Sequence, residues 1–117
     1  MGGMPRDLFD RTIERTLEEL PEEFASRLDN VQVIVDSEWP EEPDLYGLYV
    51  GVPLPERMAG SDDFRGPDRV YVFRRPLVQD FGSDARELAR EIRVTLLHEL
   101  AHHCGIDDAR LVQLGWD

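Results

Sequence analysis

The sequence predicts an α+β fold in which a small, mostly antiparallel or mixed sheet of about three strands packs with N-terminal helices and one long helix. Three observations lead to this prediction. Apolar residues recur at helical spacing toward both ends of the chain, short β-branched and aromatic runs occupy its middle, and no repeat or linker divides it. We therefore expect a single domain over residues 1–117, with two helices, three strands, a long helix and a short tail in that order.

Two helices are predicted before the first strand. In the segment 5–20, PRDLFDRTIERTLEEL, the apolar side chains share one face at helical spacing, and Pro21 interrupts the pattern. A second, short helix is predicted over 21–30, PEEFASRLDN. Pro21 suits its first turn, and Glu22 and Glu23 would lie near the positive end of its dipole.

Three runs in the middle of the chain are typical of strands. They are VQVIVDSEW (31–39), LYGLYVGVPL (45–54) and DRVYVFRRPL (68–77). We expect the second strand to be broken or bulged near Gly47 and Gly51. The third should stop at Pro76, with Arg74 and Arg75 on a solvated strand face or paired with acids. The composition of PERMAGSDDFRGPD predicts a loop before the third strand.

The longest helical pattern is SDARELAREIRVTLLHELAHHCG, which predicts a helix over 83–104. Ser83 is a plausible N-cap, and Gly105 is placed to end the helix. Leu88, Glu91 and Thr95 fall on one side of this helix, where they could line a cleft.

Composition excludes several classes of function. The formal net charge is −12, from 25 acidic and 13 basic residues, and an acidic chain is a poor ligand for nucleic acid. No apolar run approaches the roughly 20 residues needed to span a membrane. The single cysteine, Cys104, precludes an internal disulfide and fits a reducing compartment. Without a secretory signal pattern, we expect a cytoplasmic protein; its oligomeric state is not predictable.

All three histidines lie between residues 98 and 103, in HELAHHCGIDD. His98 and His102 are separated by about 40° around a helix and one turn along it, so both can bind one ion. Glu99 would flank that ion, where it can act as general base on metal-bound water. His103 projects about 140° from His98, which favours a surface or packing role. Cys104 falls on the opposite side and is expected to be buried filler.

A catalytic zinc site usually has three protein ligands and a water. Gly105 permits the chain to turn back toward the metal, and Asp108 follows three residues later. We predict one Zn²⁺ bound by His98, His102 and Asp108. Asp107 is an alternative ligand, or a hydrogen-bond acceptor for one of the histidines.

The run His-Glu-x-x-His-x-x-Gly-x-x-Asp resembles the extended metzincin motif with an aspartate at its last position. The chain also resembles a family of small bacterial proteins described as minimal zincin-like metallopeptidases. The match includes PEEF, LYGLYVGVPL, VYVFRRPL, HELAHHCGIDD and LGW. The resemblance implies a zincin-like fold, an active-site helix and metallopeptidase activity. Metzincins also have a methionine turn, but this chain has no methionine after Met58; Leu111, Leu114 or Trp116 could form the apolar floor instead.

The function expected from these features is zinc-dependent hydrolysis of peptide bonds in a peptide or protein substrate, by an endopeptidase whose catalytic base is Glu99. The substrate-binding residues are unknown, although LYGLYVG is a candidate edge strand for pairing with an extended substrate. Two alternatives stay open. One is a catalytically weak or inactive metal-containing module that binds peptides or proteins. The other is a structural metal site that only closes the fold.

Overall fold

The computed structural model describes residues 4–51 and 67–115, and the side chains of 8–51, 67–107 and 109–115. Most of the predicted loop 55–68 therefore lies outside the described residues. The elements are α1 (Met4–Glu18), α2 (Glu22–Ala25), β1 (Val31–Asp36), β2 (Gly47–Val50), β3 (Asp68–Phe73), α3 (Arg74–Phe81), α4 (Ala85–Cys104) and α5 (Asp108–Leu114).

The three strands form one mixed sheet with the order β1-β3-β2. β3 is central, parallel to β1 and antiparallel to β2. Val70 of β3 is paired with Val33 on one side and with Tyr49 on the other. β2 is consequently an edge strand among the residues that the structure describes. The α+β class and the small mixed sheet agree with the prediction.

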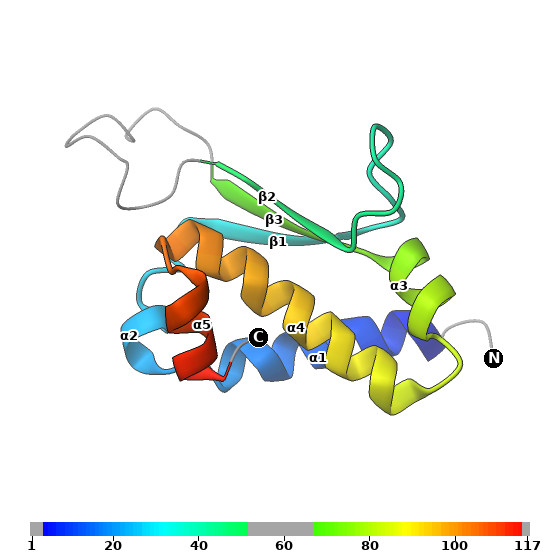
Figure 1. Ribbon diagram of the computed structural model, residues 1–117, viewed down its shortest axis with the longest axis horizontal. Coiled ribbons are helices and arrows are strands. Elements are labelled where there is room, and N and C mark those ends of the chain that lie inside the picture. Colours follow the sequence, from blue (N-terminus) through cyan, green and yellow to red (C-terminus); the bar gives the residue numbers. More distant parts are fainter. Residues whose placement is uncertain (1–3, 52–66, 116–117) are drawn as a thin grey trace.

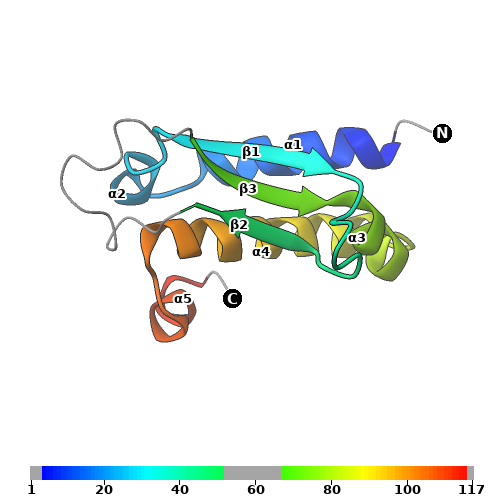
Figure 2. The same cartoon turned by 90° about the horizontal axis from the view of Figure 1, so that it is seen from above.

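The helices α1 and α4 cover one face of the sheet (Figures 1 and 2). Alternation along β3 directs Val70 and Val72 to this face, and both are fully buried. They belong to the main core, whose buried members are Phe9, Ile13, Val70, Val72, Leu77, Leu88, Ile92, Leu96 and Leu100. The first strand contributes valines that are only partly buried against this core.

A second core lies at the other end of the molecule, where α2 and α5 meet the last turns of α4 (Figure 1). Its buried members are Phe24, Leu97, Ala101, Cys104 and Leu111. Helix α4 therefore carries two apolar stripes, one for each core. This explains why it is the longest helix described, and why its position is determined by both halves of the fold.

The prediction of a strand over 68–77 is wrong beyond Phe73, because α3 begins at Arg74. Pro76 does not stop a strand but occupies the first turn of this helix. A proline is tolerated there because the backbone N–H groups of a first helical turn have no intrahelical acceptor. The two arginines also leave the strand: Arg75 pairs with Glu38 at 2.8 Å, and the guanidinium of Arg74 lies 5.6 Å from the ring centre of Phe9.

Other element ends differ from the predictions. The cap of α4 is Asp84 rather than Ser83, because Oδ1 of Asp84 accepts hydrogen bonds from the amides of Arg86 (2.9 Å) and Glu87 (3.4 Å). The second helix is limited to Glu22–Ala25. Strand β2 covers only Gly47–Val50. The expected short tail contains a further helix, α5.

We expect Leu96→Ala to lower the free energy of unfolding by about 2–5 kcal/mol, because it would leave a cavity in the main core. Leu96 is fully buried there. The matched control is Val112→Ala on α5. Val112 is 62% exposed, so this substitution should change the free energy of unfolding by less than about 0.5 kcal/mol. Urea unfolding of both variants measures the difference. Equal losses would contradict the assignment of the main core.

Candidate functional site on helix α4

His98, Glu99 and His102 lie in the second half of α4, on a side of the helix that neither core covers. Nδ1 of His102 lies 3.2 Å from Oε1 of Glu99. The side chain of His102 is 58% exposed and that of Glu99 is 16% exposed. Burial of the two apolar stripes thus presents these polar side chains toward the surface.

Strand β2 runs beside this part of α4 (Figure 2). A Cβ built on Gly47 would lie 2.6 Å from Cγ2 of Thr95, 2.9 Å from the carbonyl oxygen of Tyr71 and 3.2 Å from Cγ of Glu99. A side chain at this position would collide with its neighbours, so the glycine allows the strand to approach the helix closely. The start of β2 therefore lies directly beside Glu99.

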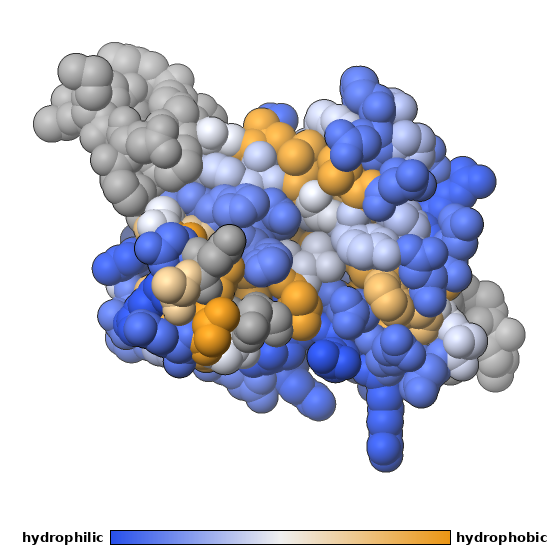
Figure 3. All heavy atoms as spheres, viewed as in Figure 1, coloured by the Kyte–Doolittle hydropathy of each residue, from blue (hydrophilic) through white to orange (hydrophobic). Residues whose placement is uncertain are grey.

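The surface around β2 and the second half of α4 has an apolar part and a hydrophilic part. Figure 3 shows apolar residues gathered over the sheet edge and hydrophilic residues below them, over α4. Val50, at the end of β2, is 40% exposed. An apolar strand edge beside polar side chains is an arrangement to which an extended peptide could bind.

Helix α4 ends as predicted at Gly105, which has a φ of 73° in the left-handed region. The amide of Gly105 donates to the carbonyl of His102, and that of Ile106 donates to the carbonyl of Ala101. These bonds satisfy carbonyls that the helix end would otherwise leave without a partner. The chain then turns directly into α5.

The two candidates for a third metal ligand, Asp107 and Asp108, lie at the start of α5. Oδ1 of Asp107 accepts a hydrogen bond of 2.9 Å from the amide of Arg110, so Asp107 caps this helix. Asp108 is the first residue of α5, and its side chain lies outside the described residues. Among the residues whose side chains are described, no group of three or more His, Cys, Asp or Glu could hold a metal. The two imidazoles one turn apart nonetheless have the donor type and spacing that zinc sites use.

The residues suggested as an apolar floor are only partly described. Leu111 is buried in the second core and Leu114 packs against it, whereas Trp116 lies outside the described residues. Cys104 belongs to the same core, as predicted. Burial raises the pKa of its thiol, although Arg27 acts in the opposite direction. The protonated thiol is a poor metal ligand and a poor nucleophile.

The three residues that sequence reasoning placed beside the cleft differ in their surroundings. Leu88 is buried in the main core and does not line the surface. Thr95 is 8% exposed and faces Gly47 of β2. Glu91 is partly exposed.

Of the two roles expected for His103, at the surface or in packing, the structure supports packing, because the residue is buried. It contacts Asp68, at the start of β3, and Tyr49 of β2. Sequence reasoning did not single out Asp68, because a lone acid before a β-branched run has no local signature. The only hint of a buried acid was His103, a histidine that the predicted metal site leaves without a role.

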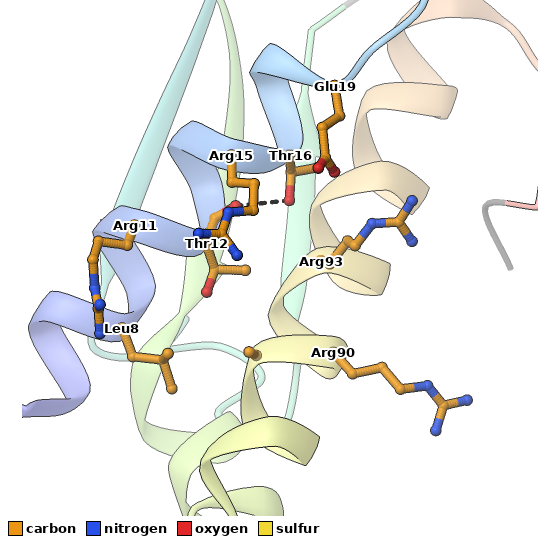
Figure 4. A pocket seen from close by; sticks show the side chains of 9 residues that line it. Leu8, Arg11, Thr12, Arg15, Thr16, Glu19, Arg90 and Arg93 are labelled. Atoms are coloured by element: carbon orange, nitrogen blue, oxygen red, sulfur yellow. Dashed lines mark hydrogen bonds between the residues drawn. The ribbon is translucent and has the colours of Figure 1, made fainter.

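A hollow of about 290 Å³ lies on another side of α4, between that helix and α1 (Figure 4). Four arginines contribute to its lining: Arg11, Arg15, Arg90 and Arg93. Figure 4 shows Arg90 and Arg93 extending away from the hollow. The four cations do not converge on one point, and we assign no site there.

Residues 16–116 match the Zincin-like metallopeptidase family. This stretch covers most of the chain, and the protein belongs to that family. The solved structure of a conserved hypothetical protein from Thermus thermophilus is similar over 96% of this chain and 99% of its own, with a TM-score of 0.58 and 25% sequence identity. No curated protein sequence matches the chain. The family membership confirms the resemblance that the motif indicated.

Within the described part of the chain, no helix is long and apolar enough to cross a membrane.

The hydroxyl of Tyr46 donates to Asp80, and this bond is the main reason why the pKa of Tyr46 rises from 10.0 to about 12. Because the folded-state pKa is raised, the stabilisation is complete below about pH 10 and is lost as the pH rises through about 12. We therefore expect the stability difference between wild type and Tyr46→Phe to be constant from pH 7 to 9 and to shrink above pH 10. Urea unfolding at each pH measures it. A difference that does not fall above pH 10 would contradict the bond to Asp80.

Proposed function

We propose that this protein is a zinc-dependent metalloendopeptidase that hydrolyses peptide bonds in peptide or protein substrates. The observation that carries the proposal is the placement of His98, Glu99 and His102 on one uncovered side of α4, next to an edge strand. Membership of the Zincin-like metallopeptidase family supports the same reaction class.

His98, His102 and Asp108 would hold one Zn²⁺. When bound, zinc polarises a carbonyl oxygen and increases the acidity of water. Glu99 would accept a proton from the attacking water and then deliver it to the leaving amine. Its carboxylate is partly exposed and lies 3.2 Å from Nδ1 of His102, so it flanks one of the proposed ligands.

Strand β2 would bind the substrate. Its outer edge is not paired within the described residues, and its start contacts the Glu99 region through Gly47. An extended peptide could add to this edge through main-chain hydrogen bonds, which recognise a peptide without requiring a particular sequence. Such an arrangement would place the backbone of the substrate close to Glu99.

A module that binds peptides with little or no cleavage is the second candidate. The observation in its favour is the 58% exposure of His102. Enclosure of the reacting groups by protein strengthens electrostatic interactions in an active site, and a side chain as exposed as that of His102 is not enclosed.

Glu99→Gln should reduce peptide cleavage by about 10²- to 10⁴-fold, the usual contribution of a general base. Zinc content should stay near that of wild type, because Glu99 is not assigned as a ligand. His98→Ala should lose both zinc and activity. A fluorescent peptide library and elemental analysis provide the two measurements.

The matched control is Glu91→Gln, two turns earlier on α4, which should retain zinc and activity. If Glu99→Gln cleaves peptides as fast as wild type, the assigned base is wrong. If wild type binds zinc and peptides but cleaves none of the library, the binding module is the better description.

Asp108→Ala should weaken zinc binding strongly, because it would remove the third ligand. Asp107→Ala should instead lower the free energy of unfolding by about 1 kcal/mol through loss of the helix cap, with little change in zinc affinity. Chelator competition and urea unfolding distinguish these effects. The reverse result would assign the third ligand to Asp107.

A further inference from the structure

His103 is adjacent to a candidate ligand but has very different surroundings. The side chain of His102 is 58% exposed, whereas that of His103 is 1% exposed. Nδ1 of His103 lies 2.8 Å from Oδ2 of Asp68, which is equally buried. The carboxyl group of Asp68 lies against Gly51, where the Cβ of any larger residue would overlap it. A buried carboxylate needs polar partners, and His103 is one of those that Asp68 has inside the fold.

The imidazole of His103 is held at both nitrogens. Nε2 lies 3.1 Å from the carbonyl oxygen of Arg27, which can only accept a hydrogen bond. Nε2 is therefore the donor in that contact, and Nδ1 meets Asp68 on the other side of the ring. Partners on both sides prevent the ring from rotating. They also fix the backbone of the last turn of α4, which includes His102.

Tyr49 connects the buried pair to the exposed histidine. Its hydroxyl donates a hydrogen bond of 2.6 Å to Oδ2 of Asp68. Its ring centre lies 6.5 Å from that of His102, in an edge-on arrangement. The bond to Asp68 thus anchors the hydroxyl end of Tyr49, whose ring is in turn a neighbour of His102.

We propose that Asp68, Tyr49 and His103 form a positioning unit that sets the orientation of the metal ligand His102. The unit acts by two routes. His103 fixes the backbone of the helical turn, and the ring of Tyr49 restricts the imidazole of His102 from the side. The three residues act through His102 and are not ligands themselves. This inference rests on the proposed function, because it takes His102 to be a zinc ligand.

Two substitutions test the unit. Asp68→Asn weakens both hydrogen bonds at Oδ2, whereas Tyr49→Phe removes one hydroxyl and keeps the ring beside His102. Residues that orient a metal ligand typically contribute about 10- to 100-fold to metal affinity. We expect a loss of this size for Asp68→Asn and a smaller loss for Tyr49→Phe. Competition with a chromogenic chelator measures zinc affinity, and the visible absorption spectrum of the Co²⁺-substituted protein reports on ligand geometry, which should also change.

Leu77→Ala is the control for a general loss of stability, since Leu77 is fully buried in the main core and belongs to α3. It should destabilise the fold but leave zinc affinity and the cobalt spectrum unchanged. Urea unfolding of every variant shows that the metal measurements are made on folded protein. If Asp68→Asn does not fold, the result for Tyr49→Phe decides alone.

The failure of this inference can be distinguished from that of the proposed function. If wild type does not bind zinc, or if His98→Ala binds it equally well, the proposed metal site is wrong and the positioning unit has no role. If wild type binds zinc through His98 and the folded variants of Asp68 and Tyr49 match it in affinity and cobalt spectrum, the site stands and the positioning unit is wrong.

Discussion

The simultaneous burial of two apolar stripes on α4 is the constraint on which the rest of the structure depends. One stripe packs in the main core beneath the sheet, and the other packs in the second core with α2 and α5. Rotation of the helix about its axis would expose one stripe or the other to water. The hydrophobic effect therefore opposes such a rotation. The direction in which His98 and His102 project is therefore fixed by leucines that have no chemical role.

The sequence predicted the elements whose signals are local. The apolar spacing of α4 and the glycine that ends it both lie within one continuous segment, as do the β-branched runs of β1 and β3. Helix α3 was missed because RRPLVQDF is only eight residues long and directly follows a strand. Its proline indicated a break, although the first turn of a helix accepts one. Which strand is central could not be predicted either, since β-propensity does not specify the order of strands.

The candidate site also has one part that could be predicted from local sequence and one part that could not. The spacing of His98, Glu99 and His102 depends on one helix, so it could be predicted from the motif alone. The bond between Asp68 and His103 joins residues that are 35 positions apart in the sequence. Neither residue has a pattern around it that indicates the other, and only the packing of β3 against the end of α4 brings them together. Such buried polar pairs are the part of a site that sequence motifs describe least well.

Among the residues that the structure describes, no strand pairs with the outer edge of β2, and this has a consequence for how the protein behaves at high concentration. The backbone groups that could pair with an extended peptide do not distinguish a substrate from a strand of another copy of the chain. Val50, which is 40% exposed, would add a hydrophobic contribution to either event. The strand is only four residues long, which limits the number of ladder hydrogen bonds available to a second copy. Under the proposed function, recognition of extended peptides and resistance to self-association would place opposing demands on the same short strand.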